Sequence, residues 1–580
     1  MSGLPSRVRG RLPELVAVVP LAIAAARALH DGWYPIGDNA FFTLRARDVL
    51  TSHHPLLGTW TSASLTVGST ILNPGPLLFD VLAVPAKIDP AGGTVLAVVG
   101  LHMACVVLGV NWARRVAGAT GAWAISAAFL GLAWAMGSEI LVEPWQPHSL
   151  LLPCLAFLVL VWALAAGEAA ALPWAAGLAS VILQTHLSYA VLVPVLSLAG
   201  VGTLVGVEVR AHGRRAAYER LRRPALVGLL VFALAWSQPV VDQVAGQGNL
   251  GTVVTTGAGD GETAGPGFAA RVLASVGAVP GGWGPGGFEG LHVDLDDRVA
   301  GEPPTLGGLA DLATAAPWVA LAAALAALAA WQAWRERSRA WASALGVAAL
   351  AVAATFVTLS LLPINEAFGI GAHQVRPVWP VVLFGTAVVA ATLLRRWRRA
   401  DVVLPAFAVV LAVLAVPAHN PRTGPSADAA AIPIVRDLVA QMDEIDSAGL
   451  VYVDLTTLRF AEPYSTPVLL ELQRRGVEFV ADEAPAAQLG RGRILHPDDA
   501  VELEMRIVEG AAAIDPEPGW TRIAFVAGLR ASEQAELDAL DARRDAGVRL
   551  DATGEHRRAA LDDRRRFQSV AVLIREAAPR

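Results

Sequence analysis

The sequence has little charge, almost no lysine and almost no cysteine. Only 17% of its 580 residues are charged and 54% are hydrophobic, whereas a soluble domain has about 25% charged residues. This excludes an ordinary soluble enzyme and a disordered chain. Cys105 and Cys154 lie in apolar runs, so they predict neither a disulfide framework nor a zinc site. The net charge of -6 is too small for this length to indicate nucleic-acid binding.

Charge is concentrated in the last quarter of the chain. Residues 1–418 hold 25 Arg/Lys and 23 Asp/Glu, whereas residues 419–580 hold 20 and 28. The sequence therefore predicts two domains, a transmembrane domain over 1–418 and a soluble domain over 419–580. Arginine supplies every positive charge except Lys87. Together with abundant Ala and Gly, this composition suggests a GC-rich bacterial genome.

Eleven apolar runs are each about long enough to cross a bilayer, which takes roughly 20 residues. A single run after Arg7, Arg9 and Arg11 would resemble a signal peptide, but ten further runs favour a membrane helix. We therefore expect a multi-span α-helical membrane protein. The runs cover about 12–30, 91–112, 119–138, 148–166, 170–187, 188–209, 225–241, 314–334, 340–362, 377–394 and 401–418.

Arginine clusters predict the orientation of these spans. When eleven spans are threaded, all five clusters fall on one side, which the positive-inside rule assigns to the cytoplasm. We expect a multi-pass plasma-membrane protein with a cytoplasmic N-terminus and an extracytoplasmic C-terminal domain. The long loops 31–90, 139–147, 242–313 and 363–376 would then lie outside and carry the chemistry. The clusters are Arg7–Arg11, Arg114–Arg115, Arg210–Arg223, Arg335–Arg339 and Arg395–Arg399.

The first outer loop contains a helix start at Gly37-Asp38. Asp38 is suited to the N-cap, and the following residues predict an amphipathic interfacial helix with Arg45, Arg47 and Asp48 on its polar face. A second interfacial helix is expected over Pro74–Pro85. Asp38 has two compatible roles, helix cap and catalytic base.

An acidic residue just past the first span, followed by an interfacial helix, resembles the GT-C superfamily of glycosyltransferases, which use polyprenyl-phosphate sugars. The resemblance implies a GT-C-like fold over residues 1–418 with Asp38 as the catalytic base. Many members have Asp-Glu or Asp-Asp at this place, whereas this chain has Asp38-Asn39. Asn39 therefore argues against a paired-carboxylate or metal-dependent version, and it becomes a candidate substrate-binding residue.

The second outer loop carries Glu139, Glu143, Trp145 and His148. In the resembling family this loop often supplies acidic or polar residues to the active site. Glu143 or His148 would orient the acceptor or, with Asp38, hold a divalent cation. The alternative is an interfacial turn anchored by Trp145. We assign Glu139, Glu143 and His148 to substrate binding and assign no metal ligand.

Two further polar segments interrupt apolar runs near the outer face. Gln184 and His186 would hydrogen-bond a sugar or form an interhelical cluster. His373 and Arg376 lie at the outer end of a span, where Arg376 suits either a lipid phosphate or anionic headgroups. In GT-C enzymes a basic residue from a late outer loop commonly contacts the donor phosphate.

The remaining outer segments offer no recognisable catalytic motif. The glycine-rich loop 242–313 lacks a phosphate-binding pattern and is either a lid or a surface insertion. Residues 419–580 alternate strand and helix patterns, which predicts a small α/β domain. Strands are expected at 450–455, 477–481, 503–508, 522–526 and 569–575, and helices at 432–447, 466–475 and 532–546.

The pattern as a whole favours an inverting integral membrane glycosyltransferase. A sugar would pass from a polyprenyl-phosphate donor to an extracytoplasmic glycan, lipid or protein acceptor. No cofactor is required, although a divalent cation is compatible, and the partners are membrane lipids and cell-envelope acceptors. The composition suggests an actinobacterial arabinofuranosyltransferase or mannosyltransferase of cell wall biogenesis. The alternatives are a flippase for lipid-linked sugars and a non-catalytic cell-envelope assembly protein.

Overall fold

The computed structural model forms two compact units. Unit 1 comprises Met1–Trp33 and Leu56–Arg422, and unit 2 comprises Tyr34–Pro55 and Thr423–Arg580. Residues 34–55 of the first outer loop thus fold with the C-terminal residues. The structure describes the chain apart from residues 1–5, 62–63, 65–69, 138–139, 257–261, 281, 283, 285–287, 289, 295–304, 366–368, 398, 419–423, 426–428, 446–447, 457, 459–461, 484–487 and 579–580.

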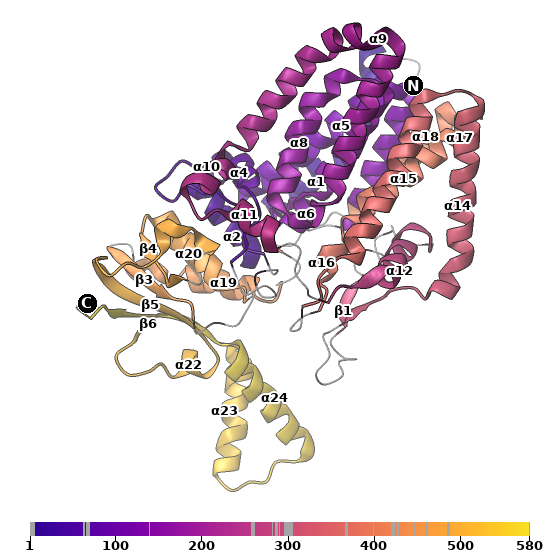
Figure 1. The fold of residues 1–580 in the computed structure, drawn as a ribbon. Helices are drawn as coiled ribbons and strands as arrows, with labels where there is room; N and C mark the ends of the chain where they lie inside the picture. The colour runs from indigo at the N-terminus through magenta and orange to yellow at the C-terminus, as the bar shows by residue number, and fades with distance from the viewer. Residues whose placement is uncertain are drawn as a thin grey trace. The chain divides into compact units, whose positions relative to one another are not determined.

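Unit 1 is a helix bundle (Figure 1). Its long helices are α1 (Ser6–His30), α5 (Gly92–Met136), α7 (Leu151–Ala166), α8 (Leu172–Thr185), α9 (Leu192–Ala235), α14 (Leu312–Arg335), α15 (Arg339–Ser360), α17 (Val378–Leu394) and α18 (Ala400–Ala418). Shorter elements connect them: α4 (Leu77–Ile88), η1 (Ile140–Val142), α6 (Gln146–Ser149), η2 (Ala169–Ala171), η3 (Leu187–Tyr189), α10 (Ser237–Ala245), α11 (Asn249–Thr256), α12 (Gly265–Gly277), α16 (Ala372–Val375) and an antiparallel pair, β1 (His292–Asp294) with β2 (Thr305–Gly307).

The predicted spans coincide with helices. In the described part of the chain, seven helices are long and apolar enough to cross a membrane, and two shorter apolar helices cover 169–185 and 400–416. Two of the seven are interrupted by non-helical backbone, α5 at Ala117 and Gly118 and α9 at Gly213, so each covers two predicted runs. The predicted run at 225–241 is not one continuous helix, because α9 ends at Ala235 and α10 begins at Ser237.

Ion pairs join the arginine clusters at one end of the bundle. The Glu14 carboxylate accepts hydrogen bonds from Arg114, and its Oε1 lies 3.2 Å from Arg11 Nη1. Arg115 pairs with Glu168 at 2.6 Å, and Glu336 pairs with both Arg395 and Arg396. Turns far apart in the sequence therefore meet. Which side of the membrane this end faces stays a prediction.

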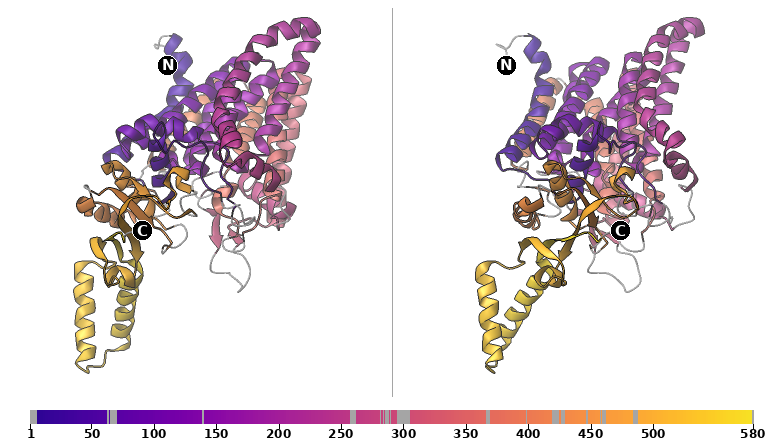
Figure 2. Two further views of the ribbon diagram at one scale, coloured as in Figure 1. Left: turned by 60° about the vertical axis from the view of Figure 1, so that its left-hand side comes forward. Right: turned by 90° about the vertical axis from the view of Figure 1, so that its left-hand side faces the viewer.

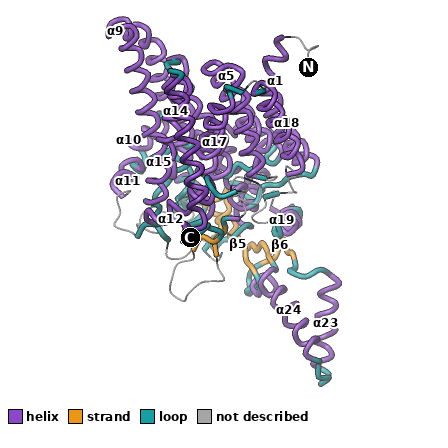
Figure 3. The backbone as a smooth tube through the Cα atoms, turned by 90° about the vertical axis from the view of Figure 1, so that its right-hand side faces the viewer, coloured by secondary structure: helices purple, strands orange, loops and turns teal. Residues whose placement is uncertain are grey.

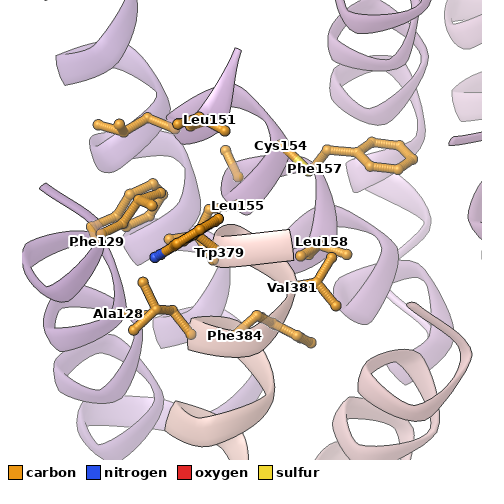
Figure 4. Close-up of a cluster of buried hydrophobic side chains, with 14 of the residues drawn as sticks. Ala128, Phe129, Leu151, Cys154, Leu155, Phe157, Leu158, Trp379, Val381 and Phe384 are labelled. Atoms are coloured by element: carbon orange, nitrogen blue, oxygen red, sulfur yellow. The ribbon is translucent and has the colours of Figure 1, made fainter. Parts of the chain in front are cut away.

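Large side chains fill the interior of unit 1. Figure 4 shows Phe129 of α5, Leu155 and Leu158 of α7, and Trp379 and Phe384 of α17 packed together. Cys105 and Cys154 are free and buried, as the sequence indicated. Because α7 is buried along nearly its whole length, it forms the centre around which the neighbouring spans pack.

Unit 2 contains a mixed five-stranded sheet in the order β4-β3-β5-β7-β6. β3 (Leu450–Asp454) pairs in parallel with β4 (Phe479–Val480) and β5 (Val501–Glu509), whereas β7 (Val570–Glu576) pairs antiparallel with β5 and β6 (Thr521–Val526). All five predicted strands are confirmed. Figure 3 marks these strands in orange. The predicted small α/β domain is therefore present.

The predicted helices of unit 2 are present, with the one over 432–447 divided in two, and the short 3-10 helix Arg491–Arg493 was not predicted. The helices of unit 2 are α2 (Gly37–Asp48), α19 (Ile432–Val439), η4 (Met442–Ile445), α20 (Ser465–Arg475), η5 (Arg491–Arg493), α22 (Ala511–Ile514), α23 (Ala531–Asp545) and α24 (Ala552–Gln568). The sequence analysis missed α22 and α24. Figure 2 shows α23 and α24 as a paired hairpin, and Leu537 and Leu561 are buried in it.

The predicted polar face of α2 is wrong. Helix formation after Ile36 is confirmed, but Arg45 and Asp48 are 5% and 1% exposed and do not face solvent. They are buried because α2 packs on α20 within unit 2. Polar and charged residues distant in the sequence form hydrogen bonds and ion pairs with them there. The second expected helix is present as α4, and its predicted interfacial location stays a prediction.

Candidate functional site

Three connections of unit 1 meet at one end of the bundle. They are the α5–α7 connection with η1 and α6, the α8–α9 connection with η3, and α16 before α17 (Figure 1). The Trp145 ring lies 4.7 Å from His148 and 5.2 Å from His373, centroid to centroid. Arg376 follows His373 by three residues, and hydrogen bonds through Asn73 and Thr59 tie the residue after His186 to Gln146 of α6. Segments separated by more than two hundred residues thus form one polar cluster.

Glu143 and His148 form the acidic part of this cluster. Glu143 Oε2 lies 2.6 Å from His148 Nδ1, and both side chains are buried. The carboxylate therefore orients the imidazole and fixes which ring nitrogen faces the cluster. His148 Nε2 is buried and makes no hydrogen bond within the described part of the chain. This nitrogen is available to a bound molecule.

Arg376 supplies the positive charge. Its guanidinium carbon lies 4.5 Å from the centre of the Phe288 ring, and it attracts Glu143 electrostatically. Nε and Nη1 are buried and, among the described residues, have no hydrogen-bond acceptor. Unsatisfied buried donors on a charged group are costly. A bound anion would satisfy one of these donors with a charge-assisted hydrogen bond.

A network of amide and hydroxyl groups lies beside the histidines. Asn73 Nδ2 donates to Thr59, and Asn73 Oδ1 accepts from the Leu187 amide at 3.0 Å. Gln146 donates to the Thr59 hydroxyl, which ties α6 to the same network. Sequence reasoning missed Asn73 as a functional candidate, although Asn73-Pro74-Gly75 is a turn signal. The network fixes η3 and α6 relative to each other.

Gln184 and Tyr189 add polar atoms next to His186. Gln184 Nε2 donates to the Ala235 carbonyl at 2.8 Å, whereas Gln184 Oε1 and the Tyr189 hydroxyl are buried without a hydrogen bond in the described residues. The His186 ring lies 6.5 Å from the Tyr189 ring. These groups are suited to bind hydroxyl groups of a sugar.

His102 is a second residue that sequence reasoning missed. It is fully buried in α5, and its two ring nitrogens each lie 3.1 Å from a carbonyl oxygen, of Leu141 and of Ser149. His102 therefore braces both ends of the connection that carries Glu143 and His148. A lone histidine inside an apolar run gave no signal of this contact.

The remaining predicted residues lie elsewhere. Asp38 and Asn39 belong to unit 2, where Asp38 is exposed on the first turn of α2 and Asn39 is 5% exposed. Ile36 occupies the N-cap position, so Asp38 is the second helical residue and not the cap. Its charge still favours the helix N-terminus. Glu139 lies outside the described residues, as do Glu366 and most of the glycine runs of 242–313.

Within the described residues, no group of three or more His, Cys, Asp or Glu side chains is arranged to hold a metal ion. The divalent cation that the sequence allows therefore has no ligand set among these residues. Among the described residues the cluster contains one carboxylate, that of Glu143, and one arginine, Arg376, and this donor set is better suited to an anion than to a cation.

The fold and the composition define a multi-span α-helical membrane protein with a C-terminal α/β domain. No family model matches the sequence, and no curated protein matches it. The chain is similar in structure to ArnT from Cupriavidus metallidurans bound to undecaprenyl phosphate, with 15% identity, a TM-score of 0.47 and coverage of 88% of this chain and 95% of ArnT. It is also similar to the Archaeoglobus fulgidus oligosaccharyltransferase, with 11% identity, a TM-score of 0.41 and coverage of 88% and 71%.

Proposed function

We propose that the protein is a GT-C-type membrane glycosyltransferase that transfers a sugar from a polyprenyl-phosphate donor to a hydroxyl acceptor outside the cytoplasm. One observation supports the proposal: the half-buried Arg376 keeps two buried N–H donor atoms without a partner in the described structure, three residues after His373, whose ring lies with that of His148 against Trp145. These donors would suit an anion, and a lipid phosphate at the end of a membrane bundle is the anion that the proposal requires.

The chemistry follows from these groups. The phosphate leaves as an anion, so stabilising it needs cations and hydrogen-bond donors more than a general acid. Arg376 would provide N–H donors to the phosphate, and His148 Nε2, which is buried without a hydrogen bond in the described residues, would be a further contact. A buried arginine interacts more strongly with the developing charge than an exposed one does.

We assign the base to Asp38. An acceptor hydroxyl must lose its proton as it attacks the anomeric carbon, and a positioned carboxylate takes that proton. Direct attack by the acceptor inverts the anomeric configuration. Asp38 follows Trp33, where the first stretch of unit 1 ends, by five residues. Gln184 and His186 would contact the sugar or the acceptor, and Glu143 would orient His148.

The sugar and the acceptor are proposed from composition alone. Arabinose and mannose in an actinobacterial cell envelope fit a GC-rich genome, so an arabinofuranosyltransferase or a mannosyltransferase acting on a glycan or lipid is the first choice for assays. The proposed orientation has a cytoplasmic N-terminus and an extracytoplasmic C-terminal domain, because the arginine clusters share one end of the bundle.

Replacing Arg376 by glutamine tests the anion site. We expect the variant to bind undecaprenyl phosphate about 10- to 100-fold more weakly, because a lost charged hydrogen bond costs about 1.5–3 kcal/mol. Binding is measured by titration of the purified protein in detergent. Arg376→Lys keeps the positive charge but loses the planar guanidinium, so its affinity for undecaprenyl phosphate should lie between those of the wild type and Arg376→Gln.

Arg271→Gln is the matched control, because Arg271 is exposed on α12 and donates to the carbonyls of Leu309 and Ala310. It should bind the lipid phosphate as the wild type does. Equal affinities of wild type, Arg376→Gln and Arg271→Gln would remove the phosphate site from the proposal.

A further inference from the structure

The segment that carries Asp38 is part of the fold of the C-terminal domain. Residues 34–55 belong to unit 2, and α2 packs on α20. The membrane spans that flank this loop in sequence belong to the other unit. Its helix is therefore held by residues that follow it by more than four hundred positions. This gives the C-terminal domain, whose role the sequence leaves open, a specific task.

The start of α2 is held next to Asp38 itself. The Gly37 amide donates to the Pro463 carbonyl at 3.3 Å, and the Thr466 hydroxyl donates to the Gly37 carbonyl at 2.6 Å. Gly37 has φ +52°, a conformation that glycine adopts without strain. Both polar backbone groups of the residue before Asp38 are thus bound to the start of α20.

The start of α20 is itself fixed by Glu462. Its carboxylate accepts from the amides of Tyr464 and Ser465, at 2.6 and 2.9 Å, and from the Ser465 hydroxyl. Burial raises the pKa of Glu462 above its usual value, although these hydrogen bonds lower it. Glu462 thus fixes the backbone just before Thr466, from which the Thr466 hydroxyl reaches the Gly37 carbonyl.

The end of α2 is held by a second set of contacts. Gln473 donates to the Leu44 carbonyl at 3.3 Å and to Asp48 at 2.7 Å, and it accepts from Arg47 at 2.9 Å. Arg493 grips Asp48 with two hydrogen bonds of 2.6 and 2.7 Å. Contacts at both ends fix the position of the helix and its rotation about its axis.

We propose that the C-terminal domain is a positioning domain for the catalytic base, with Thr466 and Gln473 as positioning residues that set the orientation of Asp38. The identity of the base in this proposal rests on the proposed function. The hydrogen bonds that hold α2 do not depend on that function. A base displaced by about 1 Å loses up to 100-fold in rate, so a dedicated holder has a clear chemical purpose.

The test uses the full-length protein in membranes and the variant Thr466→Val, which keeps the shape and removes the hydroxyl. Two quantities are measured: hydrogen–deuterium exchange of the peptide covering 37–48, and kcat and KM for the donor. We expect faster exchange in that peptide and a kcat about tenfold lower with KM unchanged, since only positioning of the base is lost. Thr466→Ser restores the hydroxyl and should recover most of the rate.

Thr553→Val is the matched control, because Thr553 is exposed on α24. It should change neither quantity. Wild-type exchange in Thr466→Val, or faster exchange without a fall in kcat, would overturn the positioning role. If wild-type protein transfers no sugar, the proposed function fails, but the exchange measurement still decides whether Thr466 holds α2.

Discussion

Replacing Asp48 by asparagine is expected to lower the free energy of unfolding of unit 2 by about 3–5 kcal/mol. Asp48 is the shared partner of two buried guanidinium groups, those of Arg45 and Arg493, at 2.6 Å each. Burial lowers the pKa of Arg45 to about 10, so this group remains charged at neutral pH. Without the carboxylate, two buried positive charges would face each other uncompensated.

Thermal melting of the purified protein in detergent, with limited proteolysis of unit 2, measures this effect. Asp443→Asn is the matched control, because Asp443 also pairs with an arginine, Arg475, but its side chain is 85% exposed. An exposed pair contributes about 0–1 kcal/mol. Equal melting of the two variants would show that the buried cluster does not stabilise unit 2.

Replacing Asp38 by asparagine is expected to lower kcat about 10²- to 10⁴-fold, with the KM for the donor unchanged. This is the range of a lost general base, and the proposed donor-binding groups, Arg376 and His148, belong to unit 1 and are unchanged in the variant. The substitution keeps size and polarity, and Asp38 is exposed on α2, so the fold should be retained. Initial rates of sugar transfer in proteoliposomes provide the measurement.

Asp31→Asn serves as the control, because Asp31 is an exposed carboxylate just after α1 in the same connection. It should transfer at the wild-type rate. A wild-type kcat in Asp38→Asn would exclude Asp38 as the base and leave Glu139 and Glu143 as the carboxylates to test.

The helices and strands were predictable because their signals are local. Apolar runs identify the membrane helices, including both halves of α5 and α9, and short β-branched runs identify all five strands of unit 2. The helix α24 was missed because it is charged on most faces and buries little beyond Leu561. Its stability comes from pairing with α23, which the sequence of α24 alone does not indicate.

Part of the candidate cluster was predictable in its residues, but its arrangement was not. Polar residues in outer loops and in one interrupted apolar run indicated His148, His373, Arg376 and His186, whereas Asp38 and Asn39 belong to unit 2. Spacing along the chain could not show that Trp145 contacts His373, or that Phe288 covers Arg376. These are contacts between connections hundreds of residues apart.

The error at α2 has the same origin. A helix with Arg45, Arg47 and Asp48 on one face resembles a helix at a water interface, because charge usually indicates exposure. Here the charges are buried because Arg493 and Gln473, which lie more than four hundred residues later in the chain, form hydrogen bonds with Asp48. The sequence of the loop contains no trace of those partners.

The most direct test of the central claim is transfer by the wild-type protein in proteoliposomes. Polyprenyl phosphates carrying labelled sugars, arabinose and mannose first, are supplied with a cell-envelope acceptor extract, and the label on lipid and acceptor is followed over time. Our interpretation predicts that label moves to the acceptor, with inverted anomeric configuration and release of polyprenyl phosphate. Label that stays on the lipid with every donor, while the intact lipid crosses the bilayer, would contradict it and indicate a flippase.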